Sequence, residues 1–311
     1  MIGTTNMMIV VRVAGCFLLG LLFLPGIAFA QDMEPRAYSN TPVGMNFLVL
    51  AYGYSSGNVV VDSTLPIEDF KVQINTPFIA YVRATDFFGR SGKVSLVMPY
   101  AWGEAEGKIS GQLTNATRSG LTDLRFKVSI MLWGAPALKM REFVKYRQKT
   151  VVGTSLQVTA PTGQHDPAKL VNLGTNRWSF KPELGVSRAL GKWTIEIHGS
   201  VTFFTDNHKY LQTSTLSQSP IGAVQGHVVY SFRPRLWAAF DAVYFTGGQT
   251  QVNGIKRNDL QSNARYGVTF SVPLAQQHSL KFLFSSGLVT RIGSSFTSVG
   301  VAYQYAWGGS R

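Results

Sequence analysis

Three polar side chains in one stretch of the chain are of the types that form a hydrolytic triad. Glu196, His198 and Ser200 are spaced two apart, so an extended strand turns all three to the same face. A serine hydrolase requires direct hydrogen bonds between its serine, its histidine and an orienting acid. Side chains two apart on a strand are separated by about 6.6 Å, which exceeds hydrogen-bond reach. Since the chain also lacks a G-x-S-x-G motif, we predict that it is not an enzyme.

Charged residues recur at alternate positions of extended stretches, where they oppose large apolar residues. In 124–132, for example, Arg125 and Lys127 alternate with leucine, phenylalanine and valine. A charge within a strand must reach water, and the interior of a closed barrel provides that water. We therefore predict that these side chains line a pore. The predicted pore-lining residues are Arg83, Arg125, Lys127, Lys181, Glu183, Glu196, His198, Asp241, Arg265 and Lys281.

Two interpretations of these charges remain open. Lys181 and Glu183 lie on one predicted strand, and Glu196 and His198 lie on the next antiparallel strand, so cross-strand ion pairs are expected. A network of such pairs would fill the interior of a small barrel and stiffen it. Alternatively, the charges form a ladder that orients a polar or anionic solute along the pore.

Two residues at the junctions of long loops and strands are predicted to border the mouth of the pore. Asp123 follows a loop rich in glycine and asparagine, and Asn176 precedes another strand. Each could border a constriction, or Asp123 could instead hold loop backbone in an Asx-type turn. His165 and Asp166, in the loop between them, are too few ligands for a zinc site, and no phosphate-binding glycine-rich motif is present. We therefore expect no metal and no cofactor.

The elements that must position these residues are strands. The alternation is clear in 296–307, where Val299, Val301, Tyr303 and Tyr305 share one face and small or polar residues share the other. Similar runs recur along the chain. The predicted strands are 45–54, 70–84, 93–104, 122–133, 150–162, 177–189, 193–205, 221–232, 236–246, 262–272, 279–290 and 296–307.

The connections between these strands differ in length. Those at 190–192, 233–235 and 275–277 are tight, whereas those near 105–121 and 206–220 are long and polar. Short periplasmic turns, long extracellular loops and aromatic residues near strand ends are typical of outer-membrane barrels. We predict an all-β fold, a transmembrane antiparallel up-and-down β-barrel of about 12 strands, in preference to a secreted β-sandwich. The predicted aromatic girdles contain Tyr100, Trp102, Trp133, Trp178, Trp193, Trp237, Tyr244 and Trp307.

The N-terminus has the features of an export signal. Arg12 precedes an apolar run, and an A-x-A cleavage motif ends at Ala30. We predict a signal peptide at 1–30, a periplasmic N-terminal segment at 31–44 and a barrel at 45–311. The single cysteine, Cys16, lies in the signal peptide, so the mature chain would contain no disulfide. The protein is therefore expected in the outer membrane of a Gram-negative bacterium.

Several segments resemble the Phenol_MetA_deg family, the "MetA-pathway of phenol degradation" proteins. The resemblance covers nearly the whole mature chain and depends on the order of short motifs, none of which is specific alone. It implies an outer-membrane barrel that acts as a transporter and is associated with the breakdown of aromatic compounds; it supplies no catalytic residues. The matching segments are 38–47 (YSNTPVGMNF), 97–100 (VMPY), 119–124 (SGLTDL), 158–163 (VTAPTG), 172–178 (NLGTNRW) and 181–185 (KPELG).

These observations together predict an outer-membrane channel or transporter for passive uptake of small aromatic or anionic solutes. The net charge of +13 predicts a polar, net-basic lumen. Expected partners are outer-membrane lipid, lipopolysaccharide, a small-molecule solute and the barrel assembly machinery, but no nucleic acid, because the basic residues are scattered along an exported chain. The alternatives are a structural or adhesion-type barrel with a plugged lumen and, less favoured, an outer-membrane lipid hydrolase. An apolar patch inside the barrel or a gap in its wall would favour transport of aromatic solutes.

Overall fold

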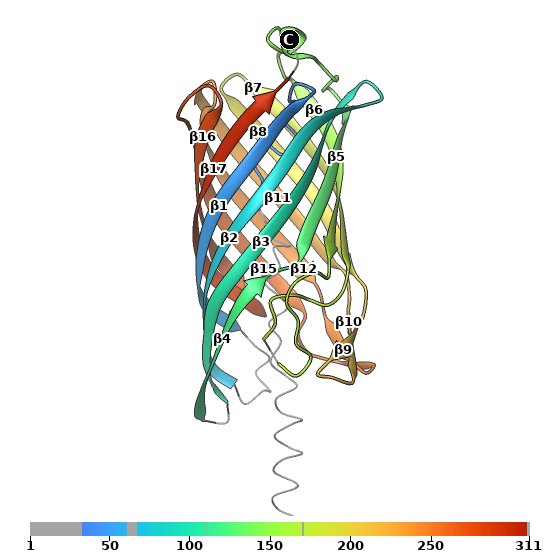
Figure 1. The fold of residues 1–311 in the computed structure, drawn as a ribbon, viewed down its shortest axis with the longest axis vertical. Helices are drawn as coiled ribbons and strands as arrows, with labels where there is room; N and C mark the ends of the chain where they lie inside the picture. The colour runs from blue at the N-terminus through green and yellow to red at the C-terminus, as the bar shows by residue number, and fades with distance from the viewer. Residues whose placement is uncertain (1–32, 61–66, 110, 170, 310–311) are drawn as a thin grey trace, which may run out of the picture.

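Twelve strands of the described residues form a closed antiparallel barrel (Figure 1). The computed structural model describes residues 33–60, 67–109, 111–169 and 171–309. Neighbouring strands in the chain are neighbours in the ring, and β1 (Met45–Val60) closes it by pairing with β17 (Gly293–Gly308) along its full length. The predicted fold class is therefore confirmed.

The remaining barrel strands follow in chain order, and their bounds are close to those predicted from alternation. They are β2 (Ile67–Phe87), β3 (Arg90–Ile109), β5 (Leu124–Trp133), β6 (Thr150–Ala160), β7 (Ser179–Leu190), β8 (Trp193–Phe204), β11 (Ile221–Arg233), β12 (Leu236–Gly247), β15 (Gln261–Pro273) and β16 (His278–Thr290).

Each barrel strand turns large apolar side chains outward. In β7, for instance, Leu184 and Val186 are exposed, while Glu183 and Ser187 on either side of them are buried. An apolar outer face on a closed ring, with every barrel strand paired on both sides, is the arrangement that a lipid bilayer requires. One exposed apolar residue from each strand in turn is Leu50, Ile79, Leu96, Phe126, Leu156, Leu184, Ile197, Val228, Phe240, Val268, Phe282 and Val301.

The two ends of the barrel differ in their connections. The end with tight turns, which we call the turn end, also carries the C-terminus (Figure 1) and the link between β5 and β6, where a one-turn helix, α2 (Met140–Phe143), forms. The opposite end, the loop end, carries the long connections. Several of these contain strands that the sequence patterns did not predict, namely β4 (Gln112–Leu121), which extends the sheet beside β3, and a small sheet of β9 (Asn207–Tyr210), β10 (Ser214–Gln218), β13 (Thr250–Val252) and β14 (Ile255–Lys256).

Five of the eight predicted girdle aromatics occur at or close to strand ends without being fully buried, namely Trp133, Trp178, Trp193, Tyr244 and Trp307. Tyr100 and Trp102 are exposed but lie in the middle of β3. Trp237 differs from all of these, because it faces the interior and is only 6% exposed. Its position in β12 is in phase with Asp241, which also faces inward. The prediction that Trp237 belongs to a membrane girdle is therefore wrong.

Within the described part of the chain, no helix is both long and apolar enough to cross a membrane. The predicted signal peptide at 1–30 lies outside the described residues.

Candidate functional site

Nine of the ten predicted pore-lining residues face the barrel interior. Seven of them are buried there, including Glu196, His198 and Asp241, each 1% exposed. The other two, Lys127 and Lys281, line interior cavities. The lumen therefore brings together most of the charges that the alternating pattern selected. The inward-facing set is Arg125, Lys127, Lys181, Glu183, Glu196, His198, Asp241, Arg265 and Lys281.

Arg83 is the exception, because it is exposed on the outer face of β2, in phase with Ile79 and Tyr81. It pairs across the ladder with Asn46, close to the turn end. An arginine at this level can extend its guanidinium toward the membrane surface while its methylene groups remain in the apolar layer. The error arose because the inner face of β2 is itself apolar, so that hydrophobicity did not distinguish its two faces.

Residues 33–38 of the N-terminal segment lie inside the barrel, whereas the segment was predicted to be periplasmic. Tyr38 of this segment is buried, with 1% of its surface exposed. Its ring fits where Gly153 and Gly185, directly paired on β6 and β7, leave the wall without side chains. The edge of the ring meets His198 at a centroid distance of 4.8 Å, and its hydroxyl donates a hydrogen bond of 2.9 Å to Glu183. The segment is thus docked on one side of the lumen.

Polar contacts also hold the residues that precede Tyr38. Glu34 forms an ion pair of 2.7 Å with Lys127. The backbone N–H of Arg36 donates to Glu196 at 2.6 Å, and its guanidinium lies 5.6 Å from the ring of Trp237, within the range of a cation–π contact. These anchors explain why a tryptophan and several charges occur on the inner face.

The other buried charges form pairs both along strands and across them. Lys181 lies 3.9 Å from Glu183 on the same strand. His227 Nδ1 lies 2.7 Å from Asp241, whose second oxygen accepts a bond of 2.9 Å from Thr269. Pairing of this kind lowers the cost of burying charge. The predicted cross-strand pairing between Lys181/Glu183 and Glu196/His198 is replaced by these contacts and by those of the N-terminal segment.

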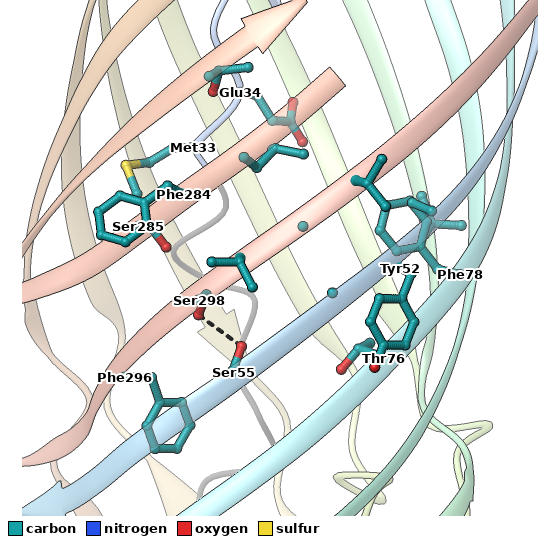
Figure 2. A pocket seen from close by; sticks show the side chains of 18 of the residues that line it. Met33, Glu34, Tyr52, Ser55, Thr76, Phe78, Phe284, Ser285, Phe296 and Ser298 are labelled. Carbon is teal, nitrogen blue, oxygen red and sulfur yellow. Dashed lines mark hydrogen bonds between the residues drawn. The ribbon is translucent and has the colours of Figure 1, made fainter. Parts of the chain in front are cut away.

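Two cavities lie along the side of the lumen that the N-terminal segment leaves open. Their volumes are about 390 and 610 Å³, in the range of small-molecule sites. They share lining residues, including Phe78, Lys127 and Leu283, so one continues into the other. The smaller cavity lies against β1, β2, β16 and β17 (Figure 2).

The lining of the smaller cavity combines apolar and basic side chains. Phe78, Leu283 and Phe296 line it together with Arg125 and Arg265, and the Arg265 guanidinium donates to the backbone oxygen of Phe296 at 3.1 Å. Ser55 and Ser298, hydrogen bonded across the seam between β1 and β17 at 2.8 Å, add hydroxyls (Figure 2). This combination suits a solute with an aromatic body and a negative charge.

In the wall beside this cavity, β16 and β17 are paired over only part of their length. The ladder between β16 and β17 extends from the turn end only as far as the pair Ser285 and Ser298, and a bulge interrupts β16 against β15 near Leu288. Residues of the outer face, among them Tyr52 and Phe284, also contribute to the lining. The cavity therefore approaches the lipid-facing surface where β16 and β17 separate.

At the loop end, the carboxylate of Asp123 joins two loops. It accepts hydrogen bonds from the backbone N–H groups of Gly163 and Thr175, at 2.9 and 2.8 Å, and from the Thr175 hydroxyl at 2.6 Å. Asn176 has a positive φ of 52° and donates to Asn207 at 2.8 Å. Asp123 therefore holds loop backbone that is 40 and 52 residues distant in the chain, which differs from the local Asx-type turn considered above. Asn176 bonds to a side chain of the neighbouring loop.

The same loop contains an acid stabilised by its surroundings. A hydrogen bond from the backbone N–H of Ala168, at 3.0 Å, and an ion pair with Lys169, at 3.2 Å, lower the pKa of Asp166. Within the described residues, no group of three or more His, Cys, Asp or Glu side chains is placed to hold a metal ion.

The residues that suggested a hydrolytic triad share the inner face, but the structure does not link them. Nε2 of His198 has no hydrogen-bond partner, and it lies 4.0 Å from Glu196. Ser200 pairs across the ladder with Glu183. Glu196 instead accepts a hydrogen bond of 2.7 Å from the hydroxyl of Ser187.

Sequence reasoning missed the docked N-terminal segment and the glycine pair that receives it. Tyr38 stands in a short polar stretch without alternation, and only the fold brings it to Gly153 and Gly185. The sequence signal that could have predicted this docking is the two glycines, which are in phase with the inward residues of their strands. An inner face without a side chain leaves room for another part of the chain.

Solved structures with this fold share little sequence with the chain. An outer membrane channel from Pseudomonas putida F1 superposes with a TM-score of 0.74 at 20% identity, covering 89% of this chain and 100% of that one. The β domain of the Bordetella autotransporter BrkA gives 0.52 at 11% identity, covering 85% and 100%, and the transport unit of AIDA-I from Escherichia coli gives 0.51 at 8%, covering 95% and 98%. These likenesses establish the fold.

Comparison of sequences identifies the family. No curated protein matches the chain. The family described as the MetA-pathway of phenol degradation matches residues 52–304, which include all of the barrel except its first few and last few residues. The chain therefore belongs to the Phenol_MetA_deg family.

Proposed function

We propose that the protein is an outer-membrane channel through which small aromatic solutes that carry a negative charge diffuse down their gradient. The observation that carries this proposal is the pair of joined cavities beside the N-terminal segment. Apolar and aromatic side chains line this path together with arginine and lysine side chains. A solute of matching chemistry could exchange its hydration for these contacts.

The membrane placement follows from the outer face and the connections. A belt of exposed apolar side chains surrounds the barrel, and barrels of this kind place short turns in the periplasm and long loops outside. We assign the turn end to the periplasm and the loop end to the cell surface. Lipopolysaccharide around the loops and the barrel assembly machinery during biogenesis are the corresponding partners.

Conductance and solute flux test this function. The mature protein, reconstituted in planar bilayers under a KCl gradient, should show discrete steps and a reversal potential that indicates preference for anions. In liposome-swelling assays, benzoate should permeate faster than benzylammonium, which has a similar ring and the opposite charge. Equal permeation rates for the two ions would contradict a basic pathway, and faster permeation of benzylammonium would indicate a pathway that prefers cations.

The plugged structural barrel is the competing function, and the docking of the N-terminal segment favours it. Tyr38, Arg36 and Glu34 all contact residues of the wall, so the segment narrows the lumen. A folded, heat-modifiable barrel that neither conducts ions nor passes benzoate would support this alternative and rule out the channel.

A further inference from the structure

Four basic residues form a continuous arc at the turn end, on one side of the barrel. Lys149, Arg188, Lys192 and Arg233 are all exposed and lie at the ends of neighbouring strands. The backbone oxygen of Lys149 accepts a bond of 2.8 Å from Ala189, next to Arg188. That of Lys192 accepts a bond of 2.8 Å from the backbone N–H two residues before Arg233. We call these four residues the basic arc.

An aromatic layer lies beside the basic arc on the outer face. Trp193, which follows Lys192 directly, packs edge-to-face on Tyr230 at a centroid distance of 4.7 Å. Tyr230 in turn packs on Phe232 at 5.0 Å. Trp193 and Phe232 are each 50% exposed. Aromatic residues of this kind mark the boundary between hydrocarbon and head groups, so the basic arc lies at head-group level.

Within the described residues, no carboxylate forms an ion pair with a member of the basic arc. The loop end is different, since Lys108 pairs with Asp69 at 3.0 Å and Lys169 pairs with Asp166 at 3.2 Å. Arg235, next to the arc, is also excluded from it, because its guanidinium binds the backbone oxygens of the next turn. Among the described residues, the positive charge of the arc is therefore not balanced by a carboxylate in contact with it.

We propose that the basic arc binds the head groups of anionic phospholipids in the leaflet that surrounds the turn end. Its position above lipid-facing aromatics favours a lipid over a soluble anion, because the acyl chains can pack on Trp193 while the phosphate meets Arg188 and Lys192. Basic residues near a membrane surface attract anionic lipid by about 1 kcal/mol each. This inference depends on the proposed membrane placement, although it does not depend on whether the lumen conducts.

Native mass spectrometry of the detergent-solubilised mature barrel provides the test. The protein is titrated with phosphatidylglycerol, with zwitterionic phosphatidylethanolamine and with a short polyglutamate peptide. Wild type should retain phosphatidylglycerol selectively. The triple variant Lys149→Gln/Arg188→Gln/Lys192→Gln should bind it more weakly, by about five-fold per residue and on the order of 100-fold in all.

A charge-matched control removes three exposed lysines of the loop end, in the variant Lys71→Gln/Lys209→Gln/Lys256→Gln, and should bind the lipid as wild type does. Equal losses in both triple variants would show a general effect of net charge and overturn the proposal. Unchanged binding in the arc variant would also overturn it, as would a stronger preference for polyglutamate, which would indicate a soluble acidic partner. Lipid binding that persists in a barrel without conductance would leave this inference standing and refute only the channel.

Discussion

Replacement of Tyr38 by alanine should release the N-terminal segment and widen the path through the barrel. The Tyr38 ring is almost completely buried between Gly153, Gly185 and His198. Its removal eliminates that packing and the hydroxyl bond to Glu183 together. The strands do not depend on this side chain, so the barrel itself should still form.

The expected magnitude follows from burial. Truncation of a buried aromatic side chain to alanine costs about 3–5 kcal/mol, and every 1.4 kcal/mol changes an equilibrium constant ten-fold. The ratio of docked to undocked segment should therefore fall by on the order of 100-fold or more. Tyr38→Phe keeps the ring and loses only the bond to a charged oxygen, at about 1.5–3 kcal/mol, so its effect should be smaller.

Single-channel recording measures this release directly. Tyr38→Ala should show a larger conductance or a larger open fraction than wild type, and Tyr38→Phe should fall between them. Gly185→Val provides an independent route, since a Cβ at this position would lie 2.1 Å from the ring of Tyr38 and must displace it while the segment stays intact. Gly199→Val is the matched control, because a Cβ there meets nothing within 4 Å.

The reasoning would be refuted if Tyr38→Ala and Gly185→Val both folded into heat-modifiable barrels with wild-type conductance. That result would mean that the docked segment does not limit the path. A conductance increase in Gly199→Val equal to that in Gly185→Val would show instead that any added side chain perturbs the wall.

Three further predictions concern the lumen, the loops and the register. Arg265→Gln should reduce the anion preference by about five-fold, the effect of ~1 kcal/mol of Coulomb energy. Arg83→Gln, on the outer face, should leave the reversal potential unchanged. A larger effect of Arg83→Gln than of Arg265→Gln would contradict the placement of Arg265 on the inner face and of Arg83 on the outer face. Asp123→Ala removes three hydrogen bonds to loop residues, so limited proteolysis should cut the loop end faster than in wild type, and an unchanged rate would argue against its anchoring role. Cysteines at Ser55 and Ser298, which are direct partners across the seam, should oxidise to a disulfide seen as a gel shift, while moving one cysteine by a single position should abolish it.

Most strands could be predicted because alternation is a local property. In β7 and β8 each inward charge stands between outward apolar residues, and the pattern predicts both the strand and its orientation. Where both faces are apolar, as in β2, the pattern still predicts a strand but not which face is inside. Arg83 was placed wrongly for that reason. Trp237 shows the converse error, because an aromatic residue near a strand end can face either way.

The loop-end strands were missed for a different physical reason. β4 and the sheet of β9, β10, β13 and β14 consist mainly of polar residues, so they have no hydrophobic periodicity. Their backbone pairs because the barrel brings the ends of the flanking strands together, which lowers the entropy cost of closing each hairpin. Such pairing depends on the strands beneath it more than on its own residues.

The sequence by itself determined that this chain forms a barrel with charges inside, because strand alternation and connection lengths are properties of consecutive residues. Only the tertiary structure decided what the charges do. Glu183, Glu196 and Lys127 were expected to face each other or a solute, yet they hold an N-terminal segment that is more than 80 residues distant in the chain. Contacts between segments so far apart depend on shape, here the space that Gly153 and Gly185 leave for Tyr38, and shape of that kind exists only once the ring has closed.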